Sequence, residues 1–286
     1  MRKVLFGTVI YKQALIFLKS YIECLKVQTK KEFDLIFIYD DLTQTNVEDM
    51  KRILNQSEFK GHFYIVPGRS KTGYISDYRI QMLLEAYEKE YELLIIGDID
   101  DLFSANRVEM VYRDYMKNPH ATFYYNMLVD FDGASILKCL PDKVDSVKII
   151  SQCNFLGMSN TAINLSRLTK EFIESLYIGA CDVFDWYLYS RILLTGGYGI
   201  LVKDAKTIYR IYEGNLVGLQ GNRISEILRE KNVKIEHYQR LEAFSEAFAT
   251  YREKLESIDI NESFYKTKYY NKNNQGYWWN NIHLEK

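Results

Sequence analysis

The sequence predicts an α/β fold with a mostly parallel β-sheet and helices packed against it. Short apolar runs alternate with stretches that carry apolar residues at helical spacing, as in βαβ units. Residues 93–96 (Leu-Leu-Ile-Ile) are apolar throughout, which is typical of a strand buried on both faces of a parallel sheet. This run leads into three carboxylates within four positions, Asp98, Asp100 and Asp101, and the other elements are arranged around this point.

The first half of the chain alternates regularly. We expect strands at residues 4–10, 33–39, 62–66 and 93–96, and helices at 14–27, 46–55 and 76–91. Further along we expect helices at 106–116, 168–177 and 182–194, strands at 121–129, 200–202 and 207–212, and helical structure over 223–256. Residues 143–152 have no clear pattern, and residues 155–161 form a polar, small-residue break that could line a pocket.

Composition and charge exclude some classes of protein. The chain of 286 residues is 47% hydrophobic and 26% charged, as expected for a soluble globular protein of one large domain or one domain with an appendage. The net charge of −1 gives no support for nucleic-acid binding, which usually needs a basic excess. The 24 tyrosines suit stacking on sugars or bases, although a general tyrosine bias would look the same.

The four cysteines are scattered, without metal-ligand spacing, so we expect reduced thiols in a cytosolic protein. The first residues lack the pattern of a signal peptide, and no apolar run is long enough to span a membrane. The sequence therefore predicts a soluble or at most peripheral protein.

The carboxylate cluster has the composition of a metal site. Strand alternation past Gly97 would send Asp98 and Asp100 to the same side, with Asp101 turned away beside them. Acidic groups this close repel one another unless a cation or hydrogen bonds offset the repulsion. Oxygen ligands at a strand end suit Mg²⁺ or Mn²⁺ that carries a phosphate. The alternative is a solvated loop or a helix cap, where Asp is also common.

Two further residues are expected at the same edge of the sheet. Tyr11 ends the first predicted strand, and Asp40 ends the second. Ligands of parallel sheets bind beyond the carboxyl ends of the strands, so one crevice can collect Tyr11, Asp40 and the Asp98 cluster.

Several short motifs together resemble the GT-A fold glycosyltransferases, especially the broad family 2 type of bacterial glycan synthesis. They are Asp40-Asp41 after the second strand, Arg79 near a helix start and the D-x-D-D at 98–101. Residues 185–188 (Asp-Trp-Tyr-Leu) resemble that family's acidic acceptor-side motif, and residues 209–215 resemble its late Y-R-x-H segment. The resemblance covers roughly residues 4–218.

The resemblance implies a GT-A catalytic domain over residues 1–218, with a nucleotide-sugar half at about 1–104 and an acceptor half at about 105–218. Residues 219–286 would form a C-terminal helical segment with an aromatic tail. It implies an inverting, metal-dependent transferase that moves a sugar from a nucleotide-sugar, in the first place a UDP-sugar, to a hydroxyl of a glycan or lipid-linked glycan. Such an enzyme would serve polysaccharide biosynthesis in the cytoplasm or at the inner face of the membrane.

On the donor side, the resemblance implies Asp101 as the first ligand of Mn²⁺ or Mg²⁺, with Asp100 beside it. Asp98 or Asp100 would hydrogen-bond the ribose; any one of the three carboxylates can instead be a structural loop residue. Asp40 would accept from the N3–H of uracil or thymine, and the ring of Tyr11 would lie against the base. A turn aspartate and a core tyrosine are the alternatives for these two.

Arg79 and Arg210 would contact the diphosphate, and a surface position is the alternative for Arg79. Asp185 is the candidate general base for the acceptor hydroxyl. It can also be a charge favoured by the helix dipole, but Asp182 is expected to be the plain helix cap. Tyr212 stands where the family often has His, so the sequence departs from the family's motif at this position.

Two other classes of function use similar residues. A phosphotransferase with an aspartyl nucleophile needs its D-x-D after the first strand, which here ends in Tyr11. A catalytically silent module that binds a nucleotide-sugar or a partner fits the same residues and stays open as the alternative.

The C-terminal region lies beyond the resemblance. Its helices should bury one apolar side, and its tail carries too many aromatic residues for a frayed terminus. We expect the tail to pack on the acceptor side of the catalytic domain, with a homodimer through the segment second and a membrane surface third. The residues expected on the buried side are Ile227, Leu228, Leu241, Phe244, Phe248 and Tyr251.

Overall fold

The computed structural model describes residues 3–70, 72–211 and 224–284, which form two compact units. The first unit comprises Met1–Ser135, Met158–Cys181 and Gly199–Arg210. The second comprises Ile136–Gly157, Asp182–Tyr198 and Ile211–Lys286, so the chain passes between the units several times. The expected functional division at residue 218 stays a prediction.

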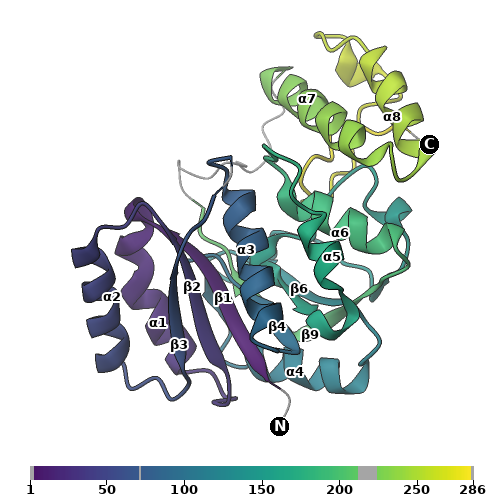
Figure 1. The fold of residues 1–286 in the computed structure, drawn as a ribbon. Helices are drawn as coiled ribbons and strands as arrows, with labels where there is room; N and C mark the ends of the chain where they lie inside the picture. The colour runs from purple at the N-terminus through teal and green to yellow at the C-terminus, as the bar shows by residue number, and fades with distance from the viewer. Residues whose placement is uncertain (1–2, 71, 212–223, 285–286) are drawn as a thin grey trace. The chain divides into compact units, whose positions relative to one another are not determined.

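The first unit is built on a twisted sheet with the strand order β3-β2-β1-β4-β8-β6-β9-β5 (Figure 1). Neighbours among β1 to β4 run parallel, β8 is antiparallel to both β4 and β6, β9 is parallel to β6, and β5 is antiparallel to β9. The strands are β1 Val4–Tyr11, β2 Asp34–Asp40, β3 Phe63–Pro67, β4 Leu93–Ile96, β5 Leu102–Phe103, β6 Phe123–Val129, β8 Thr161–Asn164 and β9 Gly199–Ile208.

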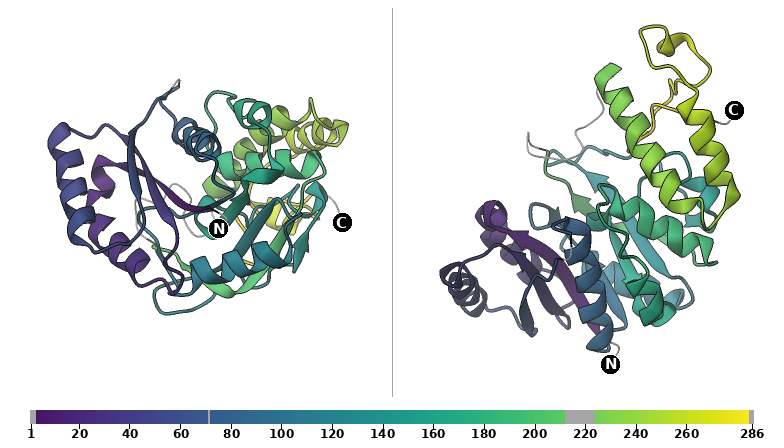
Figure 2. Two further views of the ribbon diagram at one scale, coloured as in Figure 1. Left: turned by 60° about the horizontal axis from the view of Figure 1, so that its bottom comes forward. Right: turned by 45° about the horizontal axis from the view of Figure 1, so that its top comes forward.

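Helices cover both faces of this sheet, which explains why β1 and β4 are apolar on both sides. Helices α1 (Leu18–Lys26), α2 (Gln44–Gln56) and α4 (Arg107–Lys117) lie on one face (Figure 2). Helices α3 (Ile75–Glu88) and α5 (Lys170–Glu174) lie on the other. The mostly parallel α/β architecture predicted from the sequence is confirmed.

Several details differ from the prediction. Strand β8 was not expected, because its four residues, Thr-Ala-Ile-Asn, are too few to give a periodic signal. The two strands expected at 200–202 and 207–212 are the single strand β9, whose register against β6 shifts through a bulge, and residue 212 lies outside the described residues. The helix expected from residue 14 begins with a 3₁₀ turn, Lys12–Phe17. The helix expected from residue 106 begins at Arg107, and the side chain of Asn106 before it donates to the Asp204 carbonyl.

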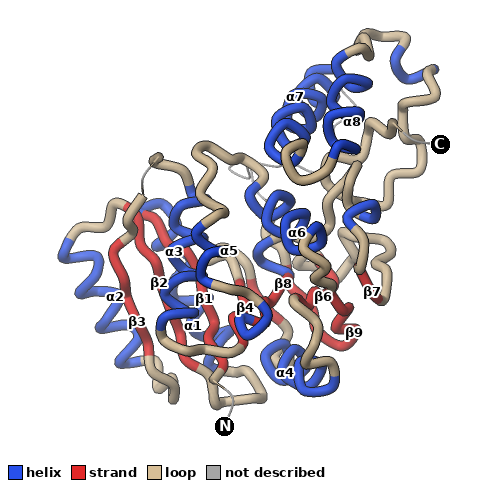
Figure 3. Tube along the Cα trace, turned by 45° about the vertical axis from the view of Figure 1, so that its right-hand side comes forward, coloured by secondary structure: helices blue, strands red, loops and turns tan. Residues whose placement is uncertain are grey.

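The second unit contains α6 (Phe184–Leu194), α7 (Ile224–Leu241) and α8 (Glu246–Glu256), and α7 and α8 lie side by side (Figure 3). The undecided residues 143–152 hold a short strand, β7 (Lys143–Val144), and a 3₁₀ turn, Val147–Ile149. The expected apolar side of the C-terminal helices is partly wrong. Leu228 and Phe244 are 41% and 48% exposed, whereas the polar side chains of Glu230, Lys234 and His237 are buried.

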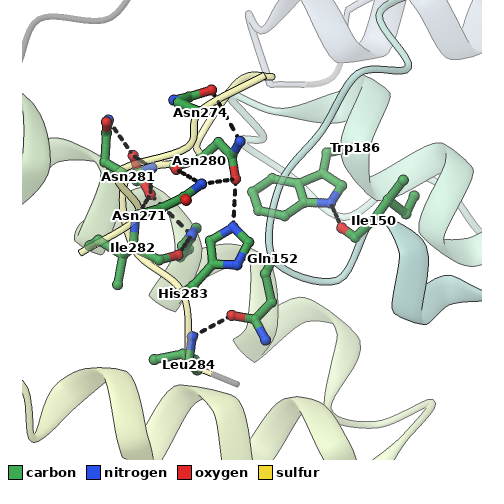
Figure 4. A network of polar contacts seen from close by, with 12 residues as sticks. Ile150, Gln152, Trp186, Asn271, Asn274, Asn280, Asn281, Ile282, His283 and Leu284 are labelled. Atoms are coloured by element: carbon green, nitrogen blue, oxygen red, sulfur yellow. Dashed lines mark hydrogen bonds and ion pairs between the residues drawn. The ribbon is translucent and has the colours of Figure 1, made fainter. Parts of the chain in front are cut away.

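The C-terminal tail is docked within the second unit (Figure 4). The backbone of Trp278 exchanges two hydrogen bonds with that of Asn154, at 2.9 and 2.8 Å between nitrogen and oxygen. The N–H of Leu284 donates to Gln152 Oε1 at 2.5 Å. Both partners belong to the range expected to form the acceptor half, so the expected intramolecular docking is observed. No helix in the described parts of the chain is long and apolar enough to cross a bilayer.

Candidate active site

The carboxyl ends of the parallel strands meet at one edge of the sheet in the first unit. Tyr11 and Asp40 are the last residues of β1 and β2 and are paired across the two strands. Strand β4 ends earlier, since Ile96 pairs with Gly7 of β1. The chain after β4 therefore turns beside a longer strand, and the predicted gathering of these strand ends is present.

The three acidic residues lie on a turn directly after β4. The N–H of Asp101 donates to the carbonyl of Asp98 at 3.1 Å, so the chain is not an extended strand here. Burial nonetheless alternates as the sequence predicted: Asp101 is buried, and Asp98 and Asp100 are half-buried. Gly97 is required before this turn, because a Cβ there would lie 2.3 Å from Cζ of Phe103. We call residues 98–101 the carboxylate turn.

Arg210, which follows β9, is brought against the carboxylate turn. Its backbone N–H donates to Asp101 Oδ1 at 2.9 Å, and its Nε donates to the Asp100 carbonyl at 2.8 Å. Its guanidinium carbon lies 4.8 and 4.6 Å from the ring centroids of Phe17 and Phe131. These contacts fix the guanidinium beside the acidic residues, as the prediction of a shared site requires.

The environment of Asp101 favours a cation beside its carboxylate. It is 1% exposed, and its Oδ2 atom has no hydrogen-bond partner among the described residues. Burial, followed by repulsion from Asp98 and Asp100, raises the pKa of Asp101 well above its ordinary value, against hydrogen bonds from Ser159 and Arg210. An unpaired buried carboxylate oxygen is costly, and a divalent cation would satisfy it.

The residues present suit a cation that also binds substrate. No cluster of three or more His, Cys, Asp or Glu side chains placed to hold a metal occurs among the described residues. Mg²⁺ and Mn²⁺ commonly take one or two carboxylates and complete their shell with substrate phosphates and water. Asp101, with Asp100 next to it, fits this kind of site.

Arg79 on α3 points to the same turn. Its Nη2 lies 3.4 Å from Asp98 Oδ1, and the two side chains are 16% and 34% exposed. The surface position that was the alternative for Arg79 is thus wrong, because this guanidinium is largely buried and paired with an acidic residue of the site.

Asp40 has a partner that the sequence analysis missed. The hydroxyl of Tyr78, on α3, donates to Asp40 Oδ1 at 2.5 Å. Burial, with a further contribution from Asp40, raises the pKa of Tyr78 to about 12, so the phenol stays a donor at neutral pH. No local sequence pattern distinguishes Tyr78, because most residues of α3 are buried and Tyr78 is one of them.

Asp185 belongs to the second unit. It is the second residue of α6, is half-buried, and its Oδ1 accepts from the N–H of Trp186 at 2.7 Å. The helix begins after Val183 without a side-chain cap, so the expectation that Asp182 caps it is wrong. Asp185 therefore supports the first turn of α6 itself, and the cap and base interpretations both stay open.

Comparison with known proteins gives a result in structure and none in sequence. No protein-family model matches the sequence. No curated protein matches it either.

Solved structures do match. Residues 1–349 of S. aureus TarS in complex with UDP-GlcNAc superpose with a TM-score of 0.59 at 11% identity, over 93% of this chain and 76% of that one. The mannosyltransferase PcManGT from Pyrobaculum calidifontis, in complex with GDP-Man and Mn²⁺, gives a TM-score of 0.54 at 12% identity, over 84% of this chain and 64% of that one. The fold is that of the GT-A glycosyltransferases.

This GT-A fold confirms what the short motifs of the sequence predicted about architecture. The identities of 11% and 12% are too low to transfer a substrate or a residue role. In this GT-A sheet the carboxylate turn, Arg79, Arg210, Tyr11 and Asp40 nevertheless lie at the edge where ligands of parallel sheets bind. The function must therefore be argued from the site.

Proposed function

We propose that the protein is an inverting, metal-dependent glycosyltransferase. It would move a sugar from a nucleotide-sugar, in the first place a UDP-sugar, to a hydroxyl of a glycan or lipid-linked glycan. A cytoplasmic location is part of the proposal and is supported by the scattered spacing of the four cysteines, which suits reduced thiols.

The observation that carries the proposal is the contact of Arg210 with the carboxylate turn. A buried carboxylate with an unsatisfied oxygen, Asp101, lies beside a fixed guanidinium. Cation-binding oxygens next to an arginine are what a nucleoside diphosphate needs, because its phosphates bind both the metal and the guanidinium. The GT-A fold of the unit agrees with this ligand.

Each donor-side residue then has a role. Asp40 accepts from the N3–H of the base through the carboxylate oxygen that Tyr78 does not bond. Tyr11 pairs with Asp40 across β1 and β2, and its ring lies against the base. Asp98 or Asp100 hydrogen-bonds the ribose. Arg210 and Arg79 neutralise phosphate charge, and Arg79 would exchange part of its pairing with Asp98 for the ligand.

The leaving group is a diphosphate whose negative charge grows as the glycosidic bond breaks. A divalent ion held by Asp101 and Asp100 supplies Lewis-acid stabilisation of this charge when bound. Arg210 adds a fixed positive charge in a site where water is partly excluded, which makes its contribution larger than in bulk solvent.

On the acceptor side, Asp185 takes the proton from the attacking hydroxyl. Sugar hydroxyls are poor nucleophiles, so a positioned carboxylate lowers the barrier. Attack from the side opposite the leaving diphosphate gives direct displacement with inversion at the anomeric carbon. The N–H of Trp186 donates to Asp185 Oδ1 and orients this carboxylate at the start of α6.

The test is calorimetric binding of UDP to the full chain with Mn²⁺ and with a chelator, followed by donor hydrolysis. We expect tighter binding with metal and a loss of this difference in Asp101→Asn. Asp34→Asn is the matched control, since Asp34 lies at the opposite end of β2 from Asp40. Equal affinities with and without metal would contradict the metal site. Tight metal-dependent binding without any turnover would favour the silent binding module.

A further inference from the structure

A chain of buried polar side chains runs beneath the carboxylate turn. Arg107 Nη2 donates to the carbonyl of Ile96, the last residue of β4, at 2.7 Å. Arg107 Nε donates to Asn126 Oδ1 at 3.1 Å. Asn126 lies on β6, in the middle of a strand whose other residues are apolar or aromatic.

The series of hydrogen-bonded side chains closes into a ring through β9 and the residues before β8. Asn126 Nδ2 donates to Thr207 Oγ1 at 3.0 Å, and Thr207 Oγ1 donates to the Ser159 carbonyl at 2.9 Å. The hydroxyl of Ser159 then accepts from the N–H of Asp98 at 3.1 Å. Ile96 and Asp98 are joined through Gly97, so these contacts form a closed ring. We call Arg107, Asn126, Ser159 and Thr207 the support ring.

The support ring is buried and unusual for a sheet core. Arg107 and Thr207 are 0% exposed, Asn126 is 1% exposed and Ser159 is 5% exposed. Apolar residues of similar volume would fill this space without the desolvation that a buried guanidinium requires. Arg107 is also left with Nη1 unpaired among the described residues. Because an apolar core would avoid this cost, we explain the support ring by the backbone groups that it holds in place.

What it holds is the backbone on both sides of Gly97. Its two ends fix the Ile96 carbonyl and the Asp98 N–H, and the hydroxyl of Tyr21 fixes the Gly97 carbonyl between them at 3.0 Å. The peptide groups that lead into the carboxylate turn are therefore bonded by side chains from several elements that are distant in sequence.

The geometry points to the support ring as a positioning device for the cation-binding carboxylates, with Thr207 as its positioning residue. The inference rests on the proposed function, since it assigns the ring to the same site. Thr207 touches neither the carboxylates nor a ligand; it acts through Ser159, whose hydroxyl sets the start of the carboxylate turn. Side chains that orient metal ligands typically change metal affinity by about 10–100-fold when they are removed.

The experiment compares Thr207→Val with Thr207→Ser. Valine keeps the β-branched shape and loses the hydroxyl, whereas serine keeps the hydroxyl. Thr122→Val is the matched control, because Thr122 is also buried and lies just before the opposite end of β6. The readouts are the Mn²⁺ concentration that half-saturates the enhancement of UDP binding and amide hydrogen exchange at residues 97–101.

In Thr207→Val, we expect the half-saturating Mn²⁺ concentration to rise by about tenfold or more. We also expect the amide hydrogens of residues 97–101 to exchange faster. Thr207→Ser should restore both values, and Thr122→Val should change neither. If Thr207→Val does not fold, Ser159→Ala makes the same comparison from the other side of the ring. Unchanged Mn²⁺ dependence and exchange in a folded Thr207→Val would overturn the inference. A wild-type protein without any metal effect would instead overturn the proposed function, and hydrogen exchange alone would still decide whether the ring positions the turn.

Discussion

Glu230 and Lys234 form a buried ion pair one turn apart on α7, with Nζ and Oε1 separated by 3.0 Å. Their side chains are 3% and 0% exposed. Both also bind the C-terminal tail. Glu230 accepts from the backbone N–H groups of Asn281 and Ile282, at 3.0 and 2.8 Å, and Lys234 donates to the Ile282 carbonyl. The tail therefore completes the hydrogen bonds of two charges that would otherwise be buried without enough partners.

The first prediction concerns Glu230. Glu230→Met should lower the free energy of unfolding by roughly 3–5 kcal/mol, because it leaves Lys234 charged and buried without its counter-ion. Glu230→Gln keeps an acceptor for the two N–H groups and should lie between this variant and the wild type. Urea unfolding measures the order. Glu236→Gln, on the exposed side of α7, is the control and should stay within about 0.5 kcal/mol of wild type. An unaffected Glu230→Met would show that the pair is not needed.

The second prediction concerns the tail. Removing the chain from Asn261 onward leaves Gln152, Asn154, Glu230 and Lys234 without the partners described above. We expect a clearly lower melting temperature by scanning calorimetry, since each unsatisfied buried group costs about 1–3 kcal/mol and a chain of this size loses about 2–4 °C per kcal/mol. A truncated protein that melts with the full chain and transfers sugar at the same rate would prove the tail dispensable.

The third prediction concerns base recognition. Tyr78→Phe removes the hydroxyl that orients the Asp40 carboxylate, and UDP affinity should fall by about 3–10-fold, which corresponds to a net hydrogen-bond contribution of about 1 kcal/mol. Asp40→Asn should weaken UDP binding further. Asp34→Asn, at the other end of the same strand, should leave it unchanged. Calorimetry with UDP distinguishes these cases. Equal UDP affinities of Tyr78→Phe and wild type would show that the Tyr78–Asp40 hydrogen bond does not contribute to recognition of the base.

The fourth prediction concerns the general base. Asp185→Asn should keep affinity for the donor within a few-fold and lose transfer by about 100-fold or more, as expected for a missing base. The amide keeps an oxygen that can accept from the Trp186 N–H, so α6 should retain its first turn. The measurements are donor binding, single-turnover transfer and melting temperature. Normal transfer by this variant would assign Asp185 to the helix start alone.

The fifth prediction concerns alkaline pH. Burial raises the pKa of the Cys153 thiol from 9.0 to about 12. The unfolded chain therefore loses this proton first as pH rises, so the folded state loses stability between about pH 9 and 12. Urea unfolding at pH 8 and at pH 10.5 should show a lower free energy of unfolding at the higher pH. In Cys153→Ala the difference between the two pH values should be smaller. The matched control is Cys139→Ala, which removes an exposed thiol. If Cys153→Ala loses as much stability between pH 8 and 10.5 as the wild type, the Cys153 thiol is not the cause.

Local patterns were sufficient for the half of the sheet that carries the site. Strands β1 to β4 are apolar runs with polar ends, so both their positions and the gathering of Tyr11, Asp40 and the carboxylate turn followed from strand geometry. Strand β8 was not predicted, because four residues are too few to show a hydrophobic period. Its place between β4 and β6 depends on partners far away in sequence.

Other features had no local signal at all. Glu230 and Lys234 look like ordinary charges on the solvent side of an amphipathic helix. Partners distant in sequence make that side an interior, among them the returning tail and Trp186, which stacks on His237 of the same helix. Asn126 was the one available clue to the support ring, since a polar residue within an apolar strand demands hydrogen-bond partners. Which partners it finds is decided by packing between β6 and β9.

The bond between Arg210 and Asp101 has a consequence for how the protein is made. It joins residues 109 positions apart, and β9, which delivers Arg210, lies between β6 and β5 in the sheet. Contacts of such long sequence separation form late, because the intervening chain must first be ordered. During synthesis the first strands can pair long before Arg210 leaves the ribosome. A donor nucleotide bound through Arg210 would therefore stabilise only the finished sheet, and its binding would report that β9 has joined the sheet.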